Sequence, residues 1–145
     1  MNFLRYAAVV FVLTFGLPIV LGLIKRVLGV NLTTAFILIV PAMIAAGIEG
    51  PKHAAKYKRM PTGSETVTFT LIGTLLAVGA QGIFLVMLVA FEPEFNGWLY
   101  SAGAGGLAIG AFLFITVAIA FSNLVSFRMG ATDQLKRNNP SDVFK

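Results

Sequence analysis

Four stretches of this chain carry no charged residue, and each is long enough to cross a lipid bilayer. They cover residues 6–24, 27–48, 66–91 and 95–127. A helix needs roughly 20 mostly apolar residues to cross the hydrocarbon core. The pattern therefore predicts an all-α integral membrane protein, a four-helix bundle that forms one domain over residues 1–128. We place its spans at about 4–24, 31–49, 64–91 and 98–127, followed by a polar cytoplasmic tail over 129–145.

The composition supports a membrane protein over a small soluble one. Hydrophobic residues make up 57% of the chain and charged residues only 12%, whereas about a quarter of an ordinary soluble domain is charged. Charge-free stretches of 19 to 33 residues cannot all be buried in a core built from 145 residues. The first stretch ends at Lys25 and Arg26 without a small-residue cleavage site, so we interpret it as a retained helix and not as a signal peptide.

The distribution of basic residues predicts the orientation. With four spans, the two termini and the middle connection share one side, which carries Arg5, four bases in the connection and four from Arg128 onward. These nine bases face only Lys25 and Arg26 on the other side. Because cytoplasmic loops are enriched in bases, we predict a multi-pass protein of the bacterial inner membrane with both termini in the cytoplasm. Its basic loop, which we expect to face lipid or a partner, contains Lys52, Lys56, Lys58 and Arg59.

Polar residues around this loop indicate where helices end. Thr62 and Glu65 have the spacing of a capping box, in which each side chain accepts a hydrogen bond from the other residue's backbone N–H. We therefore expect the third span to begin there. Glu49 and Glu65 are both interpreted as markers of helix ends at the cytoplasmic interface, and His53 as a solvated interface residue.

Two segments that flank the basic loop carry a resemblance. Residues 45–50 read Ala-Ala-Gly-Ile-Glu-Gly and residues 59–65 read Arg-Met-Pro-Thr-Gly-Ser-Glu. Together with the loop they resemble a family of small bacterial inner-membrane proteins of the ABZJ type. In that family a small-residue helix end and a short basic loop precede Arg-x-Pro-Thr-x-x-Glu, matched here by Arg59, Pro61, Thr62 and Glu65. The resemblance implies a four-span fold and an inner-membrane location, and it carries over no catalytic residue.

Small residues recur every four positions in two of the predicted spans. In a bilayer, burial of apolar surface does not drive helix association, so close approach at Gly and Ala matters more. We predict tight helix contacts at both rows, mainly within the chain, although the pattern also fits contacts with a partner. The rows are Ala102, Gly106 and Gly110 in the fourth span, and Ala42, Ala46 and Gly50 in the second.

One polar stripe lies at mid-membrane depth. Thr70, Thr74 and Gln81 of the third span fall within about 50° of one another at 100° per residue. An unpaired amide in hydrocarbon costs several kcal/mol, so Gln81 should find a partner. We interpret it as an interhelical hydrogen bond, in preference to a substrate or ion contact, because no ionisable group lies beside it. Asn123 in the fourth span is interpreted in the same way.

The inventory of reactive side chains is small. The chain has no cysteine and a single histidine, which excludes disulfides, thiol chemistry and bis-histidine haem ligation. Proton-coupled transport normally places an acid or a histidine inside the membrane, and none is predicted at mid-depth here. We therefore expect no enzymatic activity, no catalytic, cofactor or metal site, no cofactor other than bound lipid, and no nucleic-acid partner. Membrane lipids and other membrane-protein subunits, or a second copy of the chain, are the expected partners.

Two functional hypotheses follow. The first is a non-catalytic accessory, assembly or structural subunit that associates with a larger membrane complex. The second is a small homo-oligomeric transporter or flippase, which Pro18, Pro41, Gln81 and the glycine row of the fourth span support weakly.

Overall fold

The computed structural model describes residues 1–29, 35–91, 97 and 104–138. These residues form helices and no strand, which confirms the all-α prediction. In chain order the elements are α1 (Phe3–Leu28), the short 3₁₀ helix η1 (Ala35–Leu38), α2 (Val40–Tyr57), α3 (Gly63–Phe91) and α5 (Ala104–Asn138).

Three of the described helices, α1, α3 and α5, are long and apolar enough to cross a membrane. This finding indicates a membrane-embedded protein. The predicted second span, 31–49, differs from the other three. Within this span, only the residues from Val40 to the end of the span belong to α2. This helical part is about half as long as the roughly 20 residues that a crossing helix needs. The segment 35–38 forms η1, and residues 31–34 lie outside the described residues.

Pro41 explains why α2 begins where it does. The predicted span 31–49 would place Pro41 near the middle of a helix, but it lies in the first turn of α2. A proline is favourable there, because its missing N–H would have no helical acceptor. At its other end, α2 continues past Glu49 to Tyr57 and therefore includes part of the predicted loop.

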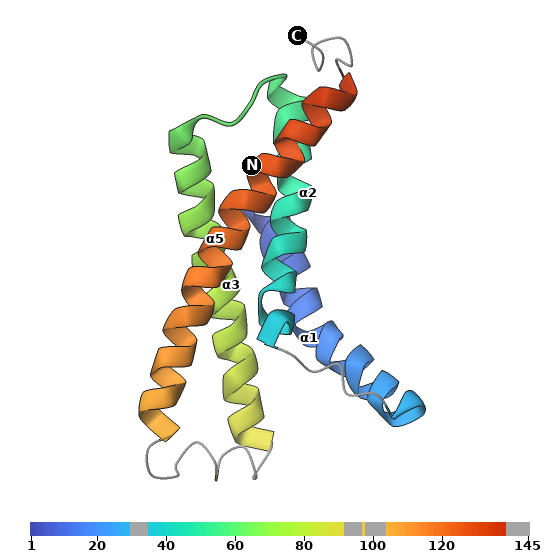
Figure 1. The fold of residues 1–145 in the computed structure, drawn as a ribbon, viewed down its shortest axis with the longest axis vertical. Coiled ribbons are helices and arrows are strands. Elements are labelled where there is room, and N and C mark those ends of the chain that lie inside the picture. Colours follow the sequence, from blue (N-terminus) through green and yellow to red (C-terminus); the bar gives the residue numbers. More distant parts are fainter. Residues whose placement is uncertain (30–34, 92–96, 98–103, 139–145) are drawn as a thin grey trace.

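The helices are packed unevenly along the molecule. The N-terminus, the α2–α3 connection and the end of α5 lie in the same half, while α1 points away from α3 and α5 in the other half (Figure 1). We call residues 3–14, 40–80 and 119–138 the closed half, and residues 15–28, 81–91 and 104–118 the open half. All residues that are buried in the described chain belong to the closed half.

Aromatic side chains join three helices in the closed half. The ring of Phe69 in α3 stacks on that of Phe127 in α5 with a centroid distance of 4.1 Å, and the edge of Tyr6 in α1 meets Phe69 at 5.4 Å. All three side chains are fully buried. Such aromatic pairs contribute about 0.5–1.5 kcal/mol beyond their buried area, so they hold α1, α3 and α5 together.

Helices α2 and α5 approach each other at two glycines. A Cβ atom on Gly50 would clash with the backbone carbonyl of Phe127. A Cβ atom on Gly130 would lie 2.7 Å from Cδ of Pro51 and 3.1 Å from the Gly47 carbonyl oxygen. Pro51 has no N–H that could donate to the Gly47 carbonyl. The backbone of α5 at Gly130 packs against this carbonyl instead.

The predicted tail is helical over most of its length. Helix α5 continues to Asn138 because Gly130 and the fully buried Ala131 still pack on the far end of α2. Residues 139–145 of the predicted tail lie outside the described residues.

Candidate functional site

One face of α2 gathers the polar chemistry of the closed half. Glu49, Lys52, His53 and Lys56 have the spacing i, i+3, i+4 and i+7, which places them on one side of a helix. Lys52 and Lys56 were predicted in a loop, but they lie within α2, which continues because His53 and Ala54 are buried against its neighbours.

Glu49 forms the buried centre of this face. It was expected at a helix end, but it lies inside α2 and is only 1% exposed. Its Oε1 accepts a hydrogen bond from Nε of Arg5 at 2.5 Å, and its Oε2 accepts one from the backbone N–H of Asn2 at 3.1 Å. Both carboxylate oxygens are therefore paired with the start of α1. The interaction fixes α1 on α2 through residues that are 44 and 47 positions apart in sequence.

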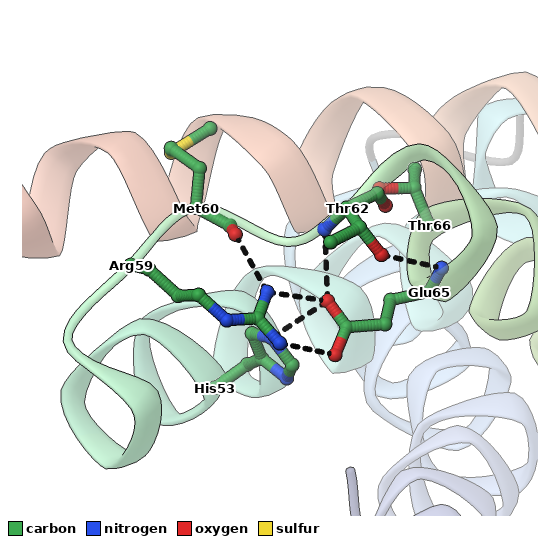
Figure 2. A network of polar contacts seen from close by, with 6 residues as sticks. All are labelled: His53, Arg59, Met60, Thr62, Glu65 and Thr66. Carbon is green, nitrogen blue, oxygen red and sulfur yellow. Dashed lines mark hydrogen bonds and ion pairs between the residues drawn. The ribbon is translucent and has the colours of Figure 1, made fainter.

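The predicted cap forms at the start of α3 (Figure 2). The Glu65 N–H donates to Oγ1 of Thr62 at 3.3 Å, and the Thr62 N–H donates to Oε2 of Glu65 at 2.8 Å. Arg59 adds a bidentate contact, because Nη1 and Nη2 donate to the two Glu65 oxygens at 2.8 Å each. This fork geometry is the strong form of an ion pair. Arg59 therefore closes the α2–α3 connection and does not extend toward lipid.

His53 is buried, so its predicted role as a solvated residue is wrong. It is 3% exposed and lies between the rings of Tyr57 and Phe127, with centroid distances of 4.6 and 5.7 Å. Its Nε2 lies 3.6 Å from Oε2 of Glu65, which is longer than a hydrogen bond. Neither ring nitrogen has a hydrogen-bond partner among the described residues. Burial lowers the pKa of His53 below its usual value, although the Glu65 carboxylate acts in the opposite direction.

A cavity of about 330 Å³ opens beside this face, between the start of α1 and the last turns of α2. Arg5, Lys52 and Lys56 provide three cationic side chains around it, and Glu49 provides one carboxylate. The net charge of these four side chains is therefore +2. His53 also lines the cavity. Lys58, the remaining base of the predicted loop, caps α2 in the left-handed conformation (φ 52°).

The residues of the predicted polar stripe occupy different environments. Gln81 donates from its side-chain amide to the backbone carbonyl of Leu38 in η1, which confirms an interhelical bond. Thr74 lies near the side chain of Asn123, with 3.3 Å between Oγ1 and the amide nitrogen. Thr70 is buried, and its hydroxyl has no partner among the described residues.

Asn123 connects all four long helices and was only partly anticipated. Its side-chain amide lies 2.8 Å from the Tyr6 hydroxyl of α1 in either orientation of the amide. With its nitrogen turned toward Tyr6, that nitrogen also lies 3.2 Å from the Ala42 carbonyl of α2, and the oxygen lies 3.3 Å from the Thr74 N–H of α3. A fully buried amide that is satisfied by three neighbouring helices favours one arrangement of the bundle.

The two small-residue rows have different outcomes. Ala42, Ala46 and Gly50 are buried, as predicted. Gly106 and Gly110 are exposed, and apart from the adjacent residues and backbone of α5 itself, no atom of the described chain lies within 4 Å of where their Cβ atoms would be. Among the described residues, the expected close packing of this row within the chain is not seen at either glycine. Ala102, the third member of the row, lies outside the described residues.

The described residues contain no group of three or more His, Cys, Asp or Glu side chains that could hold a metal ion. Comparisons with protein-family models, curated proteins and solved structures found no match. The ABZJ-type resemblance therefore stays a prediction.

Proposed function

We propose that this protein is a non-catalytic subunit of a bacterial inner membrane, with both termini in the cytoplasm, that supports the assembly or structure of a larger membrane complex. The observation that carries the proposal is the unoccupied small-residue face of α5. Gly106 and Gly110 have no neighbour within 4 Å of their Cβ positions among the described residues. A neighbouring helix can approach closely at such a face.

Exposure alone does not argue for a protein partner, because lipid chains can cover any apolar surface in a membrane. A row of glycines is different, because it lowers the side-chain bulk that would contact lipid while it permits backbone contact with a helix. The buried row of α2 illustrates this within the same chain, since α5 packs on Gly50 at backbone distance. We infer that a helix of another subunit packs on α5 in the corresponding way.

The transporter or flippase alternative has less support. Gln81 is the polar side chain considered as a substrate contact, and its amide donates a hydrogen bond to the Leu38 carbonyl. Glu49 and Glu65 are likewise paired with Arg5 and Arg59. A transport role would require Gln81→Leu to abolish a transport phenotype at unchanged membrane abundance, and unchanged transport would argue against that role.

The test is co-purification after mild detergent extraction of native membranes. We expect the tagged wild-type chain to migrate with other subunits at a fixed stoichiometry. Gly110→Leu should remove these subunits because its side chain fills the open face. Ala111→Leu is the matched control, since Ala111 is also exposed but lies 100° further around α5.

Two results would contradict the proposal. One is migration of the wild-type chain only as a monomer or homodimer. The other is equal loss of the partner subunits from both leucine variants, which would indicate general destabilisation of α5.

A further inference from the structure

The cavity between α1 and α2 has the features of an anion site. Lys52 and Lys56 lie on its rim as exposed side chains, one helical turn apart on α2. The Glu49 carboxylate in its wall does not oppose an anion strongly, because both of its oxygens accept hydrogen bonds from the start of α1. The charge that remains for a ligand is therefore positive.

His53 also lines the cavity, but the described chain encloses both of its ring nitrogens, so its side chain forms part of the wall and does not contact a ligand. Arg5 adds a third cationic side chain on the α1 side of the cavity, where only its Nε is bonded to Glu49.

The position of the cavity favours a lipid over a soluble anion. It lies at the first turn of α1, one of the three helices apolar enough to cross a membrane. The apolar ring of Phe3 forms part of its lining. An exposed apolar stripe begins in the same turn with Leu4, which is 82% exposed, and continues with Ala8 and Phe11. A headgroup in the cavity would therefore have a helix surface beside it for its acyl chains.

We propose that this cavity binds the phosphate group of an anionic phospholipid, with Lys52 and Lys56 as the main cationic contacts beside Arg5. The binding is stoichiometric and specific to this cavity, unlike the general attraction of basic loops to anionic membranes. The assignment is independent of the proposed subunit function, because it involves the closed half and not the open face of α5.

Native mass spectrometry of the full-length chain in a neutral detergent tests this site. The added lipids are phosphatidylglycerol and phosphatidylcholine with identical acyl chains. We expect one phosphatidylglycerol to bind preferentially. Lys52→Gln/Lys56→Gln should weaken its binding by roughly tenfold or more, and Lys52→Arg/Lys56→Arg should retain it.

The matched control is Lys58→Gln/Lys136→Gln, which removes the same charge outside the cavity. It should bind phosphatidylglycerol as the wild type does. All variants replace exposed side chains, and circular dichroism checks that they remain folded. Equal weakening by the control, or equal affinity for both lipids, would overturn the proposal. Displacement of the lipid by millimolar inorganic phosphate would also overturn it, because the site would then accept a soluble anion.

Discussion

The closed and open halves of this protein use the same kinds of residues in opposite ways. In the closed half, Gly50 and Gly130 allow the backbones of α2 and α5 to meet, and Asn123 connects four helices. In the open half, Gly106 and Gly110 meet nothing among the described residues. The closed half contains all buried residues of the described chain. The open half has fewer contacts between helices, among them the Gln81–Leu38 hydrogen bond and the packing of Phe15 on Phe84.

The difference shows what a small-residue row means in a membrane helix. Such a row permits close approach but does not supply an attractive partner. In α2 the partner is present in the same chain, and polar interactions such as Arg5–Glu49 hold the neighbouring helices in place. The part of α5 in the open half, residues 104–118, has no comparable polar contact with the described residues of α1 or α3. The helices separate in this half (Figure 1).

The largest difference between the two halves is expected when a glycine in each half is replaced by alanine. Gly50→Ala should lower the unfolding temperature strongly or prevent folding, because its Cβ would overlap the Phe127 carbonyl of α5. Overpacking of this kind costs about 1–3 kcal/mol or more. Gly106→Ala should leave the temperature unchanged or raise it slightly, since the space around it is open and Ala favours a helix more than Gly does. Thermal unfolding in detergent measures both, and equal effects would remove the distinction between the halves.

Loss of the Glu49 carboxylate should have the next largest effect. Glu49→Gln removes the counter-ion of Arg5 and leaves one acceptor oxygen where the carboxylate offers two, one to Arg5 and one to the Asn2 N–H. We expect a lower unfolding temperature, with partial recovery when Arg5→Gln is added, because the unpaired cation is then absent. If the double variant is as unstable as the sum of the single effects predicts, or less stable than that, the ion pair does not hold α1 on α2.

A moderate effect is expected from the Tyr6–Asn123 bond. A double-mutant cycle with Tyr6→Phe and Asn123→Ala should give a coupling of about 0.6–2 kcal/mol, the range for interhelical hydrogen bonds in membranes. Thr116→Val serves as the control in the open half, because the Thr116 hydroxyl donates only to the Phe112 carbonyl of its own helix. A coupling near zero, or a Thr116→Val effect as large as that of Tyr6→Phe, would contradict the comparison.

The smallest effect concerns pH. Because burial lowers the pKa of His53 in the folded protein, the unfolded chain takes up a proton first as the pH falls below about 6.5. The contribution of neutral His53 to stability should therefore be fully present above a pH of about 6.5 and should decline as the pH falls below it. His53 is the only histidine, so His53→Gln should flatten this dependence. A wild-type unfolding temperature that is constant from pH 7.5 to 5 would show that His53 is not buried in neutral form.

Local features of this protein could be predicted from sequence, and long-range ones could not. The Thr62–Glu65 cap was predictable because its partners are three residues apart. The burial of Glu49 and His53 was not, because it depends on Arg5 and Phe127, which are 44 and 74 positions away. A charged or titratable residue in a basic segment normally faces water, and only the packing of α1 and α5 on α2 changes that.

The predicted helix-packing residues also show that local features are predictable from sequence and long-range contacts are not. The rows in α2 and α5 have the same spacing, so nothing in the sequence distinguishes the buried row from the open one. Likewise, the cost of an unpaired amide predicted a partner for Gln81 and Asn123. It did not predict that Leu38 would accept from one, or that Tyr6 would bind the other.

The central claim, that the open face of α5 is covered by another subunit, can be tested in native membranes with a photo-crosslinking residue at Gly110. The same residue at Phe121, which is 69% exposed in the closed half of α5, serves as the reference. We predict a crosslink from position 110 to one defined partner polypeptide and none from position 121. Crosslinks from position 110 to lipid alone, or the same products from both positions, would contradict the account.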